Sequence, residues 1–127
     1  MVRIAMLHGL FNGLFHDEAV KPRSVDQNRM YFRRLGEISD QAWFNGKQYS
    51  SEGWHHYSKW HIMTDEVELK DGTIVSKLVE TPDGKLDVIS TTKLSVRCFA
   101  NYITLVEVFG ASDLNVKFSA NNNDRGY

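Results

Sequence analysis

The sequence has 127 residues, of which 42% are hydrophobic and 12% aromatic, and this length suits one folded domain rather than two. Charged residues make up 24% of the chain, and this composition is typical of a globular protein rather than of a disordered one. The opening apolar stretch ends at His8-Gly9, too soon for a signal peptide, and no apolar run is long enough to cross a bilayer. The single cysteine, Cys98, fits a reducing compartment. We therefore expect a cytoplasmic protein without a membrane segment.

The charge is nearly balanced, with 15 Lys and Arg residues against 16 Asp and Glu residues. A net charge of -1 counts against nucleic-acid binding, because phosphate contacts need a basic surface. The charges are unevenly distributed, however. Residues 21–34 contain five basic residues and only one acidic residue, Asp26, whereas acidic residues gather between Asp65 and Asp87. The sequence therefore predicts a basic face on a near-neutral protein.

The first element with a strong signal is a helix over residues 25–42. Before it, alternating apolar residues at 2–6 predict a short strand, and Asn12-Gly13 predicts a tight turn. Ser24 is the expected N-cap, and Gln27 three residues later completes a capping box. Four apolar residues recur at helical spacing and predict the buried stripe: Tyr31, Leu35, Ile38 and Ala42. Arg33 precedes Glu37 by one turn, so we expect part of its charge to be used locally.

The middle of the chain predicts a turn, a second helix and short strands. Asn45-Gly46 is the expected turn, followed by a helix from about residue 51 to 63. Turn signals at Asp71-Gly72 and Pro82-Asp83-Gly84 then separate segments rich in β-branched residues. They predict an antiparallel hairpin or three-stranded meander over 67–91, whose acidic balance makes it a poor phosphate-binding surface.

A third helix is expected over residues 96–109, with Ser95 as N-cap and Gly110 as the left-handed residue that ends it. Residues 116–118 predict a last short strand, and residues 120–127 a mobile tail. The fold class is therefore α+β, with three main helices and a small antiparallel hairpin or meander in a single domain over residues 1–119.

Three histidines are the first candidates for chemistry, since His55, His56 and His61 lie within one short segment ahead of Asp65 and Glu66. The spacing is not the four residues of a metal-binding pair on one helical face, so packed or half-exposed histidines are favoured over a metal site. The sequence has no phosphate-binding or dinucleotide glycine motif. Cys98 falls within an apolar helical pattern and is expected to be a buried structural thiol rather than a nucleophile.

The second candidate feature is a mixture of aromatic and basic residues. Single-strand binding proteins stack bases on exposed rings while Lys and Arg follow the backbone. The residues in question are Trp43, Tyr49, Trp54, Tyr57 and Trp60, with Lys47 and Lys59. The alternative is that most of these rings form the core. We expect Trp54 and Tyr57 in the core, and Tyr49 and Trp60 facing outward.

A resemblance to a known family rests on several segments in matching order. They are Arg23-Ser24-Val25-Asp26-Gln27-Asn28-Arg29, Leu35-Gly36-Glu37-Ile38, Trp43-Phe44-Asn45-Gly46-Lys47, then Trp54 and Lys59, Ser90-Thr91-Thr92-Lys93-Leu94, Phe99 and Tyr102, and Phe109-Gly110. They lie within a match that covers roughly residues 21–118, and over this stretch the chain resembles the phage NinB family, the lambda Orf-like recombination proteins.

The resemblance implies a recombination mediator that performs no catalysis and needs no cofactor or metal. Such a protein binds single-stranded DNA, cooperates with the host single-strand-binding protein, and helps to load a strand-exchange recombinase. It also implies a homodimer with a mixed α/β fold. The residues expected to contact DNA are Arg23, Gln27, Asn28 and Arg29 from the first segment, then Lys59 and Lys93, with Arg33 and Lys47 added from their neighbouring positions.

Other hypotheses stay open at this point. Asn28 and Arg29 are free to contact a phosphate near a helix N-terminus, whereas a structural interpretation pairs Arg29 with an acidic residue such as Asp26. A metal-dependent nuclease would use the histidines at 55, 56 or 61 with Asp65 or Glu66. A protein-interaction module for a host replication or recombination protein would use the acidic region between residues 65 and 87.

Overall fold

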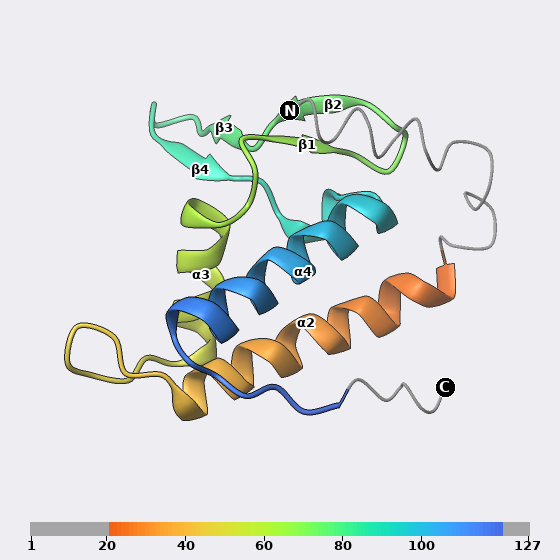
Figure 1. Ribbon diagram of the computed structural model, residues 1–127. Helices are drawn as coiled ribbons and strands as arrows, with labels where there is room; N and C mark the ends of the chain where they lie inside the picture. Colours follow the sequence, from red (N-terminus) through yellow and green to blue (C-terminus); the bar gives the residue numbers. More distant parts are fainter. Residues whose placement is uncertain (1–20, 121–127) are drawn as a thin grey trace.

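The structure is a computed structural model that describes residues 21–120 (Figure 1). The strand and turn expected in residues 2–13 and the tail expected from residue 121 lie outside the described residues. The elements are helices α2 (Lys21–Gln41), α3 (Ser51–His61) and α4 (Val96–Asp113), the 3-10 helix η1 (Thr91–Lys93), and strands β1 (Glu66–Glu68), β2 (Ile74–Ser76), β3 (Leu78–Glu80) and β4 (Leu86–Val88). The α+β class is confirmed. Among these elements, no helix combines the length and hydropathy needed to cross a bilayer.

The helices form one side of the molecule and the strands the other (Figure 1). Helix α2 packs against both α3 and α4. Its predicted stripe is confirmed, because Tyr31, Leu35, Ile38 and Ala42 are each at most 1% exposed. These side chains meet Trp54 of α3 and Val106 of α4 in one core cluster. Burial of this stripe, rather than helix propensity, stabilises α2 in place.

The start of α2 differs from the prediction. The helix begins at Lys21, so Ser24 lies within it and is not the N-cap. Pro22 explains the earlier start, because proline is favoured in the first helical turn, where its missing N–H is not needed. Gln27 therefore closes no capping box. Its Nε2 instead donates a hydrogen bond of 2.9 Å to the carbonyl of Val96, the first residue of α4.

The strands form two antiparallel hairpins, β1–β2 and β3–β4. Val67 pairs with Val75 in the first, and Val79 pairs with Asp87 in the second. The segment between the predicted turns at Asp71-Gly72 and Pro82-Asp83-Gly84 holds two strands, β2 and β3. They are separated by Lys77, whose backbone connects the hairpins. Its N–H donates to the carbonyl of Asp65 at 2.8 Å, and its carbonyl accepts from the N–H of Ile89 at 2.7 Å.

Local turn and cap signals were confirmed at two places. Asn45 and Gly46 have φ of 53° and 81°, as a tight hairpin turn requires, and Phe44 and Lys47 bridge across it. Ser95 caps α4, its side chain accepting from the Cys98 N–H.

The end of α4 was predicted incorrectly. The helix continues through Gly110 to Asp113, and Asn115, not Gly110, has the positive φ, of 57°. A Cβ at Gly110 would lie 2.6 Å from Cζ of Phe118, so the glycine is needed for close approach of the returning chain. Residues 116–118 form no strand in the described part of the chain. They pack along α2 instead, where Gln41 hydrogen-bonds both the N–H and the carbonyl of Lys117.

Candidate nucleic-acid interface

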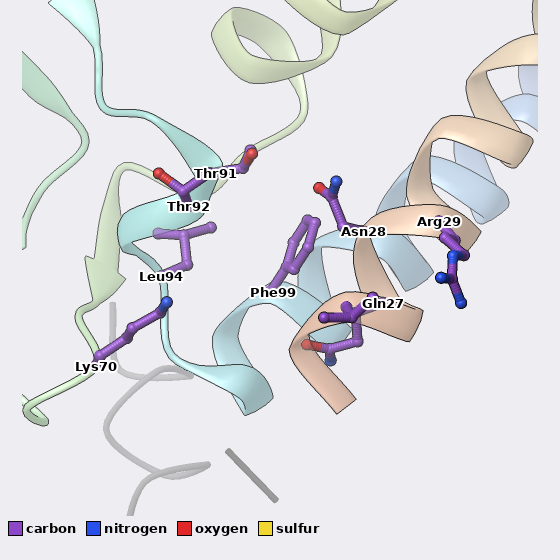
Figure 2. Close-up of a pocket in the computed structure, with 9 residues that line it drawn as sticks. Gln27, Asn28, Arg29, Lys70, Thr91, Thr92, Leu94 and Phe99 are labelled. Atoms are coloured by element: carbon purple, nitrogen blue, oxygen red, sulfur yellow. The ribbon is translucent and has the colours of Figure 1, made fainter. Parts of the chain in front are cut away.

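A hollow of about 420 Å³ lies between the N-terminal half of α2 and the segment around η1. Figure 2 shows Gln27, Asn28 and Arg29 on one side, Lys70, Thr91, Thr92 and Leu94 on the other, and the ring of Phe99 between them. Val25 completes the lining. Two sequence segments more than 60 residues apart, 23–29 and 90–94, therefore meet at one place.

The α2 side of the hollow is held by the contact between Gln27 and α4. The Gln27 carboxamide donates to the Val96 carbonyl, while its Oε1 is buried and accepts no hydrogen bond from the residues that the structure describes. Phe99 packs edge-on against Tyr31, with ring centroids 5.4 Å apart. Core packing and one hydrogen bond thus fix the relative position of α2 and α4 beneath the hollow.

The opposite side of the hollow is anchored by Glu68 at the end of β1. Its buried carboxylate accepts from the Ser95 hydroxyl at 2.7 Å and from Nε of Arg97 at 2.9 Å. Its carbonyl accepts from the Ser95 N–H, and Leu69 forms a β-bridge with Leu94. These bonds hold Lys70 next to η1, since Lys70 follows directly after the bridge.

Three of the polar side chains that line the hollow are exposed: Asn28, Arg29 and Lys70. The Arg29 side chain is 76% exposed, and it forms a 3.3 Å ion pair with the half-exposed Asp26. The structural interpretation of Arg29 is thus confirmed, but an exposed pair of this length contributes little to stability. Asn28 is exposed, as are Lys70 and, beside Thr92, Lys93. Two cations, Arg29 and Lys70, therefore line the hollow, and Lys93 directly follows the lining residue Thr92, with Asp26 and Asp71 nearby in the sequence.

Binding of a phosphate by the helix N-terminus is ruled out for this motif. Because α2 begins at Lys21, Asn28 and Arg29 lie in its third turn, where backbone N–H groups are already used within the helix. Any anion at this position has to be bound by side chains.

The other predicted site residues lie elsewhere. Arg33 is exposed and donates to the Ser119 hydroxyl at 2.8 Å, not to Glu37 as expected. Lys47 lies over the ring of Tyr49 at 5.2 Å, beyond the C-terminal end of α2 and about 20 Å along that helix from Asn28. Lys59 is half-buried on α3. The side chain of Arg23 lies outside the described residues. Of the predicted site residues whose side chains the structure describes, Gln27, Asn28 and Arg29 line the hollow. Lys93 is exposed and directly follows Thr92, which also lines it.

The aromatic residues divide between core and surface. Trp54 is buried at 2% exposure and Tyr57 packs against it, as predicted. Tyr49 also packs against the core, its ring centroid 5.9 Å from that of Trp54, so the expectation that it faces outward was wrong. Trp43 and Trp60 are exposed. They are the indole rings of the described chain that remain available to a base.

The histidines are engaged by neighbours rather than gathered into a metal site. Nδ1 of His55 lies 2.8 Å from the Tyr31 hydroxyl, and burial lowers the pKa of His55. Nε2 of His56 lies 3.2 Å from the Glu52 carboxylate, and the His61 ring lies tilted against the Tyr57 ring, with centroids 4.4 Å apart. Over residues 21–120, no three His, Cys, Asp or Glu side chains are placed to share a metal. Cys98 is buried, and burial raises the pKa of its thiol.

Lys70, Thr91 and Thr92 line the hollow but were not predicted as site residues. Lys70 was overlooked because it lies within the acidic stretch that begins at Asp65. The signal for the two threonines was present, since they belong to the segment 90–94 that carries the family resemblance. Only the fold shows that this segment lies opposite Asn28.

A protein-family model described as the NinB protein matches residues 15–119, most of the chain. The chain belongs to the NinB family. A solved structure described as "Structural Genomics, NinB" is similar to this NinB family member with a TM-score of 0.52 and 23% sequence identity, covering 92% of this chain and 82% of that chain. At this identity the likeness concerns the fold alone. A search of curated proteins found no match. NinB family membership suggests a protein related to phage recombination, and the family is not known as a catalytic one.

Proposed function

We propose that this protein is a phage recombination mediator that binds single-stranded DNA through the hollow and its surrounding cations, without catalysis. One observation carries the proposal: the two family segments 23–29 and 90–94 converge on one hollow whose surrounding cations are exposed. Exposed Arg and Lys side chains can neutralise the phosphates of a DNA strand. In this proposal the protein acts as a homodimer in the host cytoplasm, and assists a recombinase on DNA coated by the host single-strand-binding protein.

Fluorescence anisotropy of a labelled single-stranded oligonucleotide at two salt concentrations tests the proposal. Arg29→Ala is expected to weaken binding several-fold at low salt and to make the salt dependence shallower by about one phosphate contact. Lys93→Ala is expected to act in the same direction. Both side chains are exposed, so neither change should affect folding.

Lys85→Ala is the matched control, because Lys85 is exposed in the turn between β3 and β4, away from α2 (Figure 1). It should retain wild-type affinity and salt slope. If the wild-type protein does not bind the oligonucleotide at low salt, the DNA-binding proposal is wrong. Equal losses for Lys85→Ala and Arg29→Ala would instead show that general charge, not the hollow, determines binding.

A second candidate function is docking of a host replication or recombination protein. The β3–β4 hairpin favours it, because apolar side chains are exposed there beside acidic ones. Leu78, Val79 and Leu86 are between 37% and 55% exposed, and Glu80 and Asp87 are on the same strands. An exposed apolar cluster with a polar border is typical of a protein-binding surface. Nuclease-resistant capture of a purified single-strand-binding protein, lost in Leu86→Ser, would support this function.

A further inference from the structure

The hollow beside α2 combines an apolar floor with polar sides. The apolar part consists of Val25, which is 54% exposed, together with the largely buried Leu94 and Phe99. A site for phosphate alone would need cations but no apolar floor. The volume of about 420 Å³ falls within the range of small-molecule sites, about 300–1,000 Å³. The hollow therefore suits a compact ligand with apolar faces and polar edges.

The polar group best placed to contact such a ligand is the Asn28 amide. It projects from α2 on the side of the Phe99 ring, whereas the Arg29 guanidinium points away from that ring (Figure 2). Asn28 is exposed, and it makes no side-chain hydrogen bond with the residues described. An amide offers two donors and an acceptor in one plane, which matches the edge of a nucleobase.

Cations stand on opposite sides of the hollow. Arg29 lies on the α2 side, and Lys70 lies across from it beyond Phe99 (Figure 2), with Lys93 one residue after Thr92. In a nucleic-acid strand, each base is flanked by two phosphates. Cations on two sides of an amphipathic hollow thus correspond to a nucleotide whose base points inward and whose backbone passes over the rim.

We propose that the hollow receives one unstacked base of the single strand, with Asn28 at its polar edge and Val25 and Phe99 at its apolar face. This inference rests on the proposed function and adds to it a base-dependent contact. Phosphate contacts alone would leave affinity independent of the bases. If one base is bound in the hollow, part of the affinity depends on the presence of bases in the strand, whatever the base sequence.

The experiment compares an oligo-dT strand with a strand of the same length in which every base is replaced by an abasic tetrahydrofuran. Wild-type protein is expected to bind oligo-dT about tenfold more tightly, the order of effect of stacking one base. Exposed Trp43 and Trp60 also contribute to this ratio of affinities. Variants of the hollow are therefore needed to show that part of the ratio comes from the hollow. Val25→Ala with Asn28→Ala should reduce the ratio at least threefold, while binding to the abasic strand stays at its wild-type strength.

Arg29→Ala is the matched control on the same helix, and it should weaken binding to both strands equally and leave the ratio unchanged. Both Val25 and Asn28 are exposed positions of a helix, where alanine is well tolerated, and a circular dichroism melt confirms folding. If the double variant Val25→Ala with Asn28→Ala leaves the ratio unchanged, the proposed base contact is wrong, but the proposal that the protein binds DNA still stands. Binding to neither strand at low salt overturns the proposed function itself.

Discussion

The two halves of α2 differ in how their arginines are bonded. Arg29 in the N-terminal half is 76% exposed, with a 3.3 Å contact to Asp26. Arg34, five residues later, has a side chain only 4% exposed and pairs with Glu37 at 2.8 Å and Glu107 at 2.7 Å. Its guanidinium also lies over the Phe118 ring. One arginine of α2 is therefore exposed to solvent and open to a partner, whereas the other is buried in ion pairs that stabilise the fold.

The difference shows that a count of basic residues overstates the basic surface. Residues 21–34 contain five basic residues, but Arg34 is buried and neutralised by two carboxylates, and Arg33 is hydrogen-bonded to Ser119 and Ala120. Two exposed cations, Arg29 and Lys70, line the hollow instead, and Lys70 comes from the acidic stretch. Fold position, not sequence density, determines which charges face a partner.

The largest effect is expected from Arg34→Met, which removes the buried cation at the C-terminal half of α2. Glu37 and Glu107 would lose their partner, and loss of one side of a buried ion pair costs about 3–5 kcal/mol. We expect about 3 kcal/mol here, because Glu107 is 33% exposed and the Ser119 N–H still donates to Glu37. Urea unfolding monitored by tryptophan fluorescence measures this change.

Arg33→Met is the control for Arg34→Met, since Arg33 is its exposed neighbour. Its loss should lower the free energy of unfolding by less than about 1 kcal/mol. DNA binding by Arg34→Met, measured below its unfolding temperature, should stay close to that of wild type. Equal destabilisation by the two variants would contradict the distinction drawn between a structural and a surface arginine.

A smaller effect is expected from Gln27→Ala, which removes the hydrogen bond between α2 and the first residue of α4. A neutral bond of this kind contributes about 0.5–1.5 kcal/mol, and removal of the buried, unpartnered Oε1 offsets part of that loss. The free energy of unfolding should therefore fall by no more than about 1 kcal/mol. Asn28→Ala, one residue away and exposed, should leave stability unchanged. A larger loss for Asn28→Ala than for Gln27→Ala would show that the bond to Val96 does not anchor the helix.

Local chemistry explains which parts of the fold could be predicted from sequence. The stripe beginning at Tyr31, the Asn45-Gly46 turn and the Ser95 cap each depend on residues within a few positions of one another. Contacts between distant residues could not be predicted. Lys77 is an example, because its buried Nζ donates to the carbonyls of Lys59, Trp60 and Met63 at the end of α3.

The candidate site was predictable only in its parts. The family segments contain Asn28, Arg29, Thr91 and Thr92, but nothing in a single sequence indicates that these residues line one hollow. Gly110 shows the same limit. Its position after an apolar helical stripe is typical of a helix end, yet its real constraint is the Phe118 ring, which reaches it only after the chain reverses at Asn115.

The smallest effect concerns pH and the half-buried His55 at the core side of α3. Burial is the main cause that lowers the pKa of His55, and the nearby Lys59 and His56 add to it against the opposing charge of Glu52. The unfolded chain takes up a proton near the ordinary pKa of about 6.5, whereas the folded protein resists it. This part of the stability is therefore fully present above pH 6.5 and is lost as the pH falls toward the lowered pKa of the folded state.

His55→Gln removes this titration while retaining an acceptor that the Tyr31 hydroxyl can use. The melting temperature of the wild type should fall more between pH 7.5 and pH 5.5 than that of His55→Gln. His56→Gln is the matched control, because it removes an exposed histidine and leaves His55 in place. It should retain most of the wild-type dependence on pH. If His56→Gln flattens the profile as much as His55→Gln does, burial of His55 is not the source of the acid sensitivity, and surface charge on α3 is.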